Sequence, residues 1–204
     1  EQSGFRKKRN TNDQLYLLTQ KIYEAFNRKS GIDAIFIDFE KCFDKIWKKG
    51  LLYKLHLMNI PKKDLNIINS FLHNRNIYIQ IENEKSNSFY PKEGLPQGSC
   101  LSPLLFILFA SDIPTKLNTI LSQFADDLAL YARTSNNNYN HNIRLQKHLT
   151  EIIKWCDKWK LKINIKKTKS MSFTKSPVNY NRKYRIKNQN IELSRTHFRH
   201  SINI

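Results

Sequence analysis

The stretch AIFIDFEKCFD, residues 34–44, joins a run of apolar residues directly to a carboxylate. Residues Ala34 to Ile37 are typical of a buried strand, and Gly31 breaks the preceding helical pattern just before them. Asp38 closes the run, and a bare carboxylate at the end of a buried strand is costly unless a cation offsets its charge. The stretch therefore predicts a central strand with a cation site at its end.

A second acidic pair interrupts the apolar run QFADDLALYA, residues 123–132. Short strand-like segments flank the pair, so Ala125, Asp126 and Asp127 are predicted to form the turn of a hairpin. Taken alone, the pair fits an ordinary polar turn. If Asp38 converges with one of these acids, they can hold two divalent ions about 4 Å apart, which is the arrangement used in two-metal phosphoryl transfer.

The loop GLPQGSCLSP, residues 94–103, combines glycines with a single amide side chain. Glycine lets the backbone approach a ligand closely, and Gln97, next to Gly98, can hydrogen-bond a sugar or a base. The loop fits equally well a tight turn before a helix that begins at Ser102, with the serine hydroxyl as its cap and Pro103 in its first turn.

Phe43 and the lysines of KINIKKTKSM, residues 162–171, are weaker candidates. An aromatic ring five residues beyond Asp38 can pack beside whatever the site binds, and it fits a core phenylalanine as well. Lys167 or a neighbouring lysine can supply a proton or neutralise phosphate charge. For each single lysine, a solvated side chain is the simpler interpretation.

The charge of the chain points to an anionic partner. Its 204 residues include 35 Lys and Arg against 17 Asp and Glu, a net charge of +18, and 40% are apolar, which suffices for one domain with or without a subdomain. Such an excess indicates nucleic acid first and a membrane surface second. No apolar run is long enough to span a bilayer. The cysteines, Cys42, Cys100 and Cys156, show no paired spacing, which predicts an intracellular protein of the nucleus or cytoplasm that is not secreted.

The order of the expected elements predicts an α+β fold. A capping box of Thr11 and Gln14 begins the first helix, and from Lys175 onward the chain is polar, basic and poorly patterned. Helices are expected over 15–26 and 46–55, from 61, from 102 and over 143–159, and strands over 34–38, 77–81, 88–90, 121–124, 128–132 and 170–174.

Taken together and in this order, FIDFEKCFD, LPQG, FADD and INIKKT resemble the palm motifs of reverse transcriptases. GFRKKRNTNDQL resembles the finger motif that precedes them. The amino-acid sequences of these motifs, including GLPQGSCLSPLLFILFASDIP, are most similar to those of non-LTR (LINE-type) retrotransposons, particularly the insect Jockey-like group. The resemblance extends from Gly4 to about Thr174.

The resemblance implies a fold and an activity. The fold is a right-hand polymerase palm, an antiparallel sheet with helices packed on one face, together with part of the fingers. Residues 1–33 would belong to the fingers, 34–174 to the palm with finger elements between its motifs, and 175–204 to a basic tail at a truncated or decayed thumb junction. The activity is that of an RNA-directed DNA polymerase, with two Mg²⁺ ions, or Mn²⁺ in their place, and with an RNA template, a DNA primer and deoxynucleoside triphosphates as partners; no membrane is involved.

Carried over position by position, the resemblance assigns site residues of three kinds. The metal ligands are Asp38, Asp126 and the backbone carbonyl of Phe39, with Asp127 beside them. The nucleotide contacts are Phe43, as the gate that excludes a ribose 2′-hydroxyl, together with Gln97 and Gly98, and Lys167 is the general acid toward the departing pyrophosphate. The finger motif adds a basic cluster expected to contact nucleic acid: Arg6, Lys7, Lys8 and Arg9.

Two other interpretations stay open. Group II intron-like and other retroelement reverse transcriptases share these motifs, and a catalytically inactive nucleic-acid-binding remnant would share the charge. The chain begins after the family's upstream finger block, which holds a triphosphate-binding arginine, and ELSRTHFRHSINI, residues 192–204, does not match the expected Leu-Gly turn. We therefore expect the chain by itself to be weakly active at most.

Overall fold

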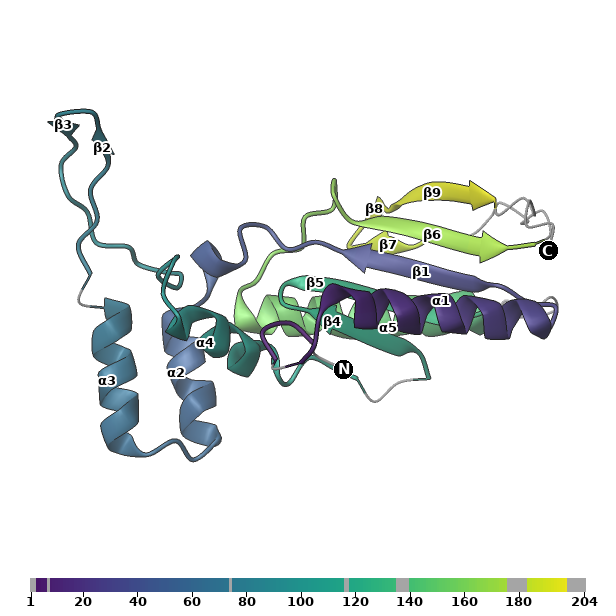
Figure 1. The fold of residues 1–204 in the computed structure, drawn as a ribbon, viewed down its shortest axis with the longest axis horizontal. Helices are drawn as coiled ribbons and strands as arrows, with labels where there is room; N and C mark the ends of the chain where they lie inside the picture. The colour runs from purple at the N-terminus through teal and green to yellow at the C-terminus, as the bar shows by residue number, and fades with distance from the viewer. Residues whose placement is uncertain are drawn as a thin grey trace. The chain divides into compact units, whose positions relative to one another are not determined.

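The computed structural model describes residues 3–6, 8–73, 75–115, 118–134, 140–175 and 183–197 (Figure 1). The chain divides into two compact units. The first unit comprises Glu1–Glu40, Ile113–Lys158 and Lys162–Ile204, and the second comprises Lys41–Asp112 and Trp159–Leu161.

A five-stranded sheet dominates the first unit, with the strand order β4-β5-β1-β6-β9. β1 is central and pairs antiparallel with β5 and with β6, while β9 lies at the edge, parallel to β6. The bounds are β1 Ile32–Ile37, β4 Ile120–Phe124, β5 Asp127–Arg133, β6 Lys169–Thr174 and β9 Glu192–His197. The predicted hairpin around the acidic pair is β4–β5, and the prediction of an α+β fold with a central antiparallel sheet is confirmed.

Both faces of β1 are buried, because Ala34 and Ile35, whose side chains point to opposite sides, are each 0% exposed. On one face α1, Thr11–Asn27, packs Phe26 into a cluster with Ala34. α5, Asn140–Trp159, lies behind the sheet in Figure 1 and buries an apolar stripe of its own. Both faces of β1 are therefore shielded from water, as its apolar residues require.

The N-terminus of α1 is capped one residue earlier than predicted. Asn10 Oδ1 accepts from the Asp13 N–H at 3.1 Å, and Asp13 Oδ2 accepts from the Asn10 N–H at 2.9 Å. This pair forms the reciprocal capping box, so the prediction of Thr11 and Gln14 is wrong. Gln14 instead donates through its side chain to the Ser3 hydroxyl.

His148 joins α5 to the segment that precedes β4. The ring is 0% exposed, its Nε2 lies 2.7 Å from the Pro114 carbonyl oxygen, and its Nδ1 contacts the Thr119 hydroxyl. A carbonyl only accepts, so Nε2 carries the proton and Nδ1 of the neutral ring accepts from the hydroxyl. Burial lowers the pKa of His148, and the Pro114 carbonyl and the charge of Glu151 offset part of this effect.

The segment 183–197 holds more structure than its composition indicates. Besides β9, it forms the hairpin of β7, Arg185–Ile186, and β8, Gln189–Asn190. Tyr184 is buried and donates its hydroxyl to Asp33 Oδ2 at 3.1 Å. Two-residue strands are too short to show an alternation of apolar and polar residues, so the sequence pattern does not predict them.

The second unit consists of helices, a 3₁₀ turn and a short hairpin. Its elements are η1 Phe43–Lys45, α2 Lys48–Leu57, α3 Lys62–His73, β2 Gln80–Ile81, β3 Glu84–Lys85 and α4 Leu101–Ala110. Ile77 forms an isolated bridge with Phe89, so the strands expected over 77–81 and 88–90 do pair, but only in short pieces. Within the part of the chain that the structure describes, no helix is long and apolar enough to cross a membrane.

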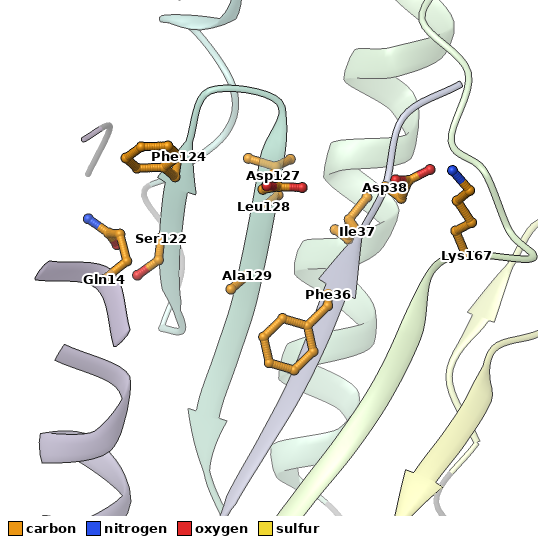
Figure 2. A pocket seen from close by; sticks show the side chains of 10 residues that line it. All are labelled: Gln14, Phe36, Ile37, Asp38, Ser122, Phe124, Asp127, Leu128, Ala129 and Lys167. Atoms are coloured by element: carbon orange, nitrogen blue, oxygen red, sulfur yellow. The ribbon is translucent and has the colours of Figure 1, made fainter. Parts of the chain in front are cut away.

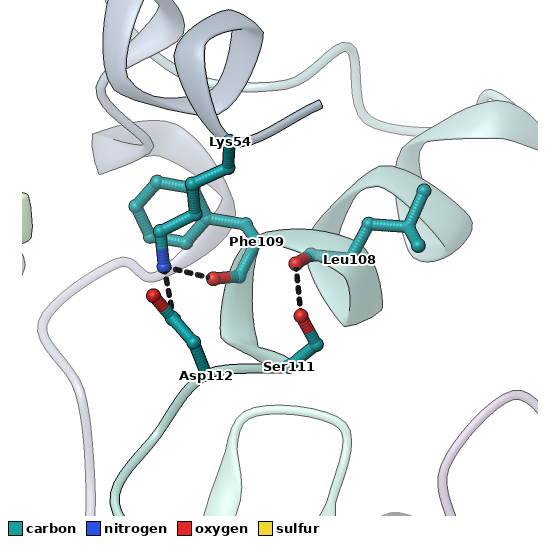
Figure 3. Close-up of polar contacts among 5 residues, drawn as sticks. All are labelled: Lys54, Leu108, Phe109, Ser111 and Asp112. Carbon is teal, nitrogen blue, oxygen red and sulfur yellow. Dashed lines mark hydrogen bonds and ion pairs between the residues drawn. The ribbon is translucent and has the colours of Figure 1, made fainter. Parts of the chain in front are cut away.

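A buried ammonium group joins α2 to α4 (Figure 3). Lys54 is 3% exposed, and its Nζ donates to the Phe109 carbonyl and to the Asp112 carboxylate. The same ammonium lies 3.9 Å from the ring centroid of Trp159 and 4.5 Å from that of Phe109. Because the aromatic faces and the carbonyl replace much of its hydration, the charge is tolerated and fixes the C-terminal end of α4.

The start of α4 differs from the prediction. Ser102 lies inside the helix and donates its hydroxyl to the Pro96 carbonyl at 2.6 Å, while the Ser99 hydroxyl accepts from the Leu101 N–H at 3.2 Å. Ser102 is therefore not the cap. Its hydroxyl holds the loop before α4 against the first turn of the helix.

We expect the protonation of His148 to set part of the pH dependence of stability. Because its folded pKa is lowered from 6.5, the stability that neutral His148 contributes is fully present above this value. That stability is lost as the pH falls through the folded pKa. Urea unfolding at about pH 7.5 and about pH 5 should therefore show a larger loss in the natural chain than in His148→Gln.

The control for this measurement is His56→Gln, which changes an exposed histidine and should keep the natural pH dependence. An unchanged pH dependence in His148→Gln would contradict the assignment.

Candidate catalytic site

The register of the sheet brings two of the expected acids together. Ile37 at the end of β1 pairs with Leu128, so the register continued by one residue sets Asp38 opposite Asp127, the first residue of β5. Because side chains alternate along a strand, Asp38 lies on the same face as Phe36. The two carboxylates therefore meet at one end of the sheet, as the apolar runs predicted.

Lys167 joins them from the other side of β1. Phe36 pairs with Lys169 of β6, and the register continued by two residues sets Asp38 opposite Lys167. Figure 2 shows the carboxylates of Asp127 and Asp38 and the ammonium of Lys167 in a row across the ends of the strands, with the ammonium turned toward Asp38.

These three charged side chains line a cavity of about 360 Å³ (Figure 2). Its other walls are mostly apolar and belong to β1, β4 and β5, with two polar groups contributed by α1 and β4. They are Phe36, Ile37, Phe124, Leu128 and Ala129, with Gln14 and Ser122. A charged edge above apolar walls suits a ligand with a phosphate group and a flat, less polar part.

Like charges shape the electrostatics of this cavity. Burial raises the pKa of Asp127, and the neighbouring charges of Asp126 and Asp38 raise it further. A cation placed among these oxygens would relieve the repulsion.

The donor set fits Mg²⁺. Carboxylate oxygens are hard ligands, and Mg²⁺ is usually held by one or two carboxylates together with water and substrate phosphates. Among the described residues, no group of three or more His, Cys, Asp or Glu side chains is gathered closely enough to form a complete protein cage.

Asp126 occupies the turn between β4 and β5. The connection is tight, with Ala125 in the left-handed region at φ 55°, and β5 begins at Asp127. Asp126 is half-buried and close enough to Asp127 to raise its pKa, whereas Asp127 is the member of the pair that lines the cavity. The turn is thus formed by Ala125 and Asp126, ahead of the acid that lines the cavity.

The N-terminal segment lies against this turn, which sequence reasoning missed. The Ser3 N–H donates to the Gln123 carbonyl at 2.8 Å, and a Cβ on Gly4 would lie 2.2 Å from Ala125 N. Only glycine allows the backbone to approach the acidic turn this closely. The sole sequence signal for this contact is that a glycine stands at position 4.

The expected nucleotide contacts lie in the second unit. Phe43 is half-buried, with its ring centroid 5.0 Å from that of Phe106. Its carbonyl accepts from the Leu95 N–H at 2.8 Å, and Gln97 Nε2 donates to Asp44 Oδ1 at 2.7 Å. The loop before α4 and the 3₁₀ turn η1 are therefore bonded to each other. Asp44, which holds the amide of Gln97, was not singled out from the sequence.

The remaining candidates are placed as follows. Gly98 is exposed at φ 81°, where glycine is favoured. Phe39 is buried and forms a bridge with Ile163. In the basic cluster Arg6, Lys8 and Arg9 are exposed, and Lys7 lies outside the described residues.

Residues 1–191 match the family model of the reverse transcriptase (RNA-dependent DNA polymerase). The chain belongs to the reverse transcriptase family. The match covers both units, including the charged row and the loop before α4, so the predicted family membership is confirmed.

Relatives in this family come from insect retrotransposons. The chain is 35% identical to the probable RNA-directed DNA polymerase from transposon BS of Drosophila melanogaster, over 85% of this chain and 20% of the relative. It is 31% identical to the RNA-directed DNA polymerase from mobile element jockey of the same species, over 84% of this chain and 19% of the relative. The chain thus spans about a fifth of the length of these relatives.

Solved structures of reverse transcriptase relatives share the fold. Telomerase from Candida albicans in complex with a fragment of telomeric RNA matches with a TM-score of 0.63 at 13% identity, over 84% of this chain and 31% of that one. Apo telomerase from Candida tropicalis, truncated from its C-terminal domain, matches with a TM-score of 0.61 at 14% identity, over 86% and 37%. The mixed helix and sheet architecture is that of a polymerase palm.

Gly4→Ala is expected to disturb the acidic turn. The added Cβ would meet backbone atoms of Ala125, so either the N-terminal segment or the turn must move, and overpacking of this kind costs about 1–3 kcal/mol. Urea unfolding would measure the loss, and faster hydrogen exchange of the Ser3 amide would locate it. Asn12→Ala, at an exposed position in the first turn of α1, is the control. Unchanged stability and exchange in Gly4→Ala would contradict the close contact.

Proposed function

We propose that this chain is the palm, with part of the fingers, of a retrotransposon RNA-directed DNA polymerase. As part of its protein it would add deoxynucleotides to a primer 3′-hydroxyl on an RNA template. The observation that carries the proposal is the row of Asp127, Asp38 and Lys167 along one cavity, within the region matched by the family model. The proposed division assigns 1–33 to the fingers, 34–174 to the palm and 175–204 to a tail at a thumb junction.

The acids and the lysine have complementary roles in this proposal. Asp38 and Asp126, with the Phe39 carbonyl, would hold two Mg²⁺ ions, and Asp127 would add negative charge beside them. Bound Mg²⁺ supplies Lewis acidity and offsets phosphate charge. On the opposite side of Asp38, Lys167 Nζ would deliver a proton to the departing pyrophosphate, because it is the ammonium that lines the cavity.

Nucleotide selection is assigned to the second unit. The ring of Phe43 is fixed on one side by Phe106 and by its own backbone bond to Leu95, so it would resist displacement by a ribose 2′-hydroxyl. Gln97, held by Asp44, and Gly98 would contact the incoming nucleotide.

The partners follow from the charge. A net charge of +18 supports binding to an RNA template and a DNA primer through their phosphates, with the exposed Arg6, Lys8 and Arg9 among the contacts. An intracellular location, in the nucleus or cytoplasm, agrees with cysteines that lack paired spacing.

Substituting the acids one at a time tests the site. Asp38→Asn, Asp126→Asn and Asp127→Asn should each lower the rate constant of primer extension roughly 100-fold or more, because each removes charge that stabilises the transition state. Single-turnover extension on an RNA template, with enzyme in excess over primer, is sensitive enough for a weakly active chain. Asp157→Asn, which changes an exposed carboxylate on α5, is the control and should extend at the natural rate.

Each acid variant should bind the template–primer as well as the natural chain and unfold at the same or a higher temperature, because the acids repel one another. Extension by Asp38→Asn at the natural rate would overturn the site. If the natural chain binds the template–primer and does not extend it, the inactive remnant is the better interpretation.

Phe43→Val should admit ribonucleotides. Loss of the ring removes the steric barrier to the 2′-hydroxyl, so the ratio of kcat/KM for deoxynucleotide over ribonucleotide should fall about tenfold or more. Phe89→Ala, which removes an exposed ring of the second unit, is the control and should keep the ratio. An unchanged ratio in Phe43→Val would show that Phe43 only packs in the core and does not select the nucleotide.

A further inference from the structure

The turn between α5 and β6 closes on a single asparagine. The Thr168 N–H donates to the Asn164 carbonyl at 2.9 Å, and the Lys167 N–H donates to Asn164 Oδ1 at 3.3 Å. One residue therefore fixes the backbone on both sides of the Lys167 side chain.

The same turn binds both backbone polar groups of Asp38. The Asn164 N–H donates to the Asp38 carbonyl at 2.8 Å, and the Asp38 N–H donates to Thr168 Oγ1 at 3.2 Å. Regular pairing of β1 with β6 ends at Phe36 and Lys169, so the threonine hydroxyl takes the place of the next bond between the strands. Thr168 is 0% exposed, and its hydroxyl is shielded from competing water.

This arrangement matters because lysine is a flexible residue. An ammonium on a four-carbon stem explores a wide region unless the origin of the stem is fixed. Lys167 is exposed, whereas the backbone around it is tied to Asp38. Both charged groups line the same cavity, so the turn sets the region that the ammonium can reach around the Asp38 carboxylate.

We propose that Thr168 and Asn164 are positioning residues that hold Lys167 at a fixed offset from Asp38. Neither residue is required to touch the substrate. Their bonds make the lysine and the carboxylate move as one body while a triphosphate enters and pyrophosphate leaves. The inference rests on the proposed function of the cavity, and a misplacement of about 1 Å at a reacting centre can cost about 100-fold in rate.

Thr168→Val and Thr168→Ser test the hydroxyl. Valine keeps the branched shape and removes the acceptor for the Asp38 N–H, and serine keeps the acceptor. The chain offers a matched control at the other end of β1. There the hydroxyl of buried Thr134 accepts from the Gly31 N–H at 3.0 Å, and the Thr134 backbone N–H donates to the Gly31 carbonyl at 2.8 Å. Thr134→Val therefore removes the same kind of bond at a distance from the acids.

In steady-state primer extension, Thr168→Val should lower kcat about 10- to 100-fold with little change in KM for the nucleotide. Thr168→Ser should stay within about threefold of the natural chain, and Thr134→Val should lower the unfolding temperature without lowering kcat. Hydrogen exchange at the Asp38 amide should accelerate in Thr168→Val and stay slow in Thr168→Ser. In a Lys167→Gln background, Thr168→Val should have little further effect on kcat, because the residue that it positions is gone.

The outcomes separate the two claims. If the natural chain extends and Thr168→Val lowers kcat no more than Thr134→Val, the inference is overturned. It is also overturned if Thr168→Val costs as much in the Lys167→Gln background as in the natural chain, because the hydroxyl would then act on the fold alone. If the natural chain binds the template–primer and does not extend it, the proposed function fails instead.

Discussion

The antiparallel pairing of β1 with strands on both sides is the constraint on which the site depends. A single register between β1 and β5 sets Asp38 opposite Asp127, and a single register between β1 and β6 sets it opposite Lys167. A slip of one residue in either pairing would turn one side chain of the row to the other face of the sheet. The apolar contacts on both faces of β1 therefore do more than stabilise the fold: they decide which charges meet.

The placement of charge runs against the average of the chain. A protein with a net charge of +18 gathers Asp38, Asp126 and Asp127 in one small region, where burial and mutual repulsion raise the pKa of Asp127. The rest of the structure holds these groups in place through backbone contacts, including those of Gly4 and Thr168. A site for cations and phosphates requires carboxylates that repel one another in the free protein and a stable fold that holds them close together.

Much of this could be predicted from the sequence, and the exceptions have physical reasons. The strand before Asp38 and the hairpin around Asp126 are local patterns of apolar residues and turn residues, so they were predicted. Gly4, Asp44 and Thr168 act across long separations in the sequence, and their contacts exist only once the registers are set. The predicted cap of α1 was wrong for a different reason. Asn10 and Thr11 can both cap a helix, and the residue three positions later decides which of them forms the capping box.

The central position of β1 has a consequence for how the chain reaches its native state. β1 is synthesised before both of its neighbours, because Ile32 pairs with Arg133 and Phe173, which follow it far along the chain. Contacts between residues so far apart in the sequence form slowly, because a long loop must close before the contacts can stabilise the fold. Until then a strand that is apolar on both faces is exposed with two unpaired edges, which is the feature that most favours aggregation. The α1 helix, which precedes this six-residue strand and packs against it in the native fold, is the element available to cover it before its neighbouring strands are made.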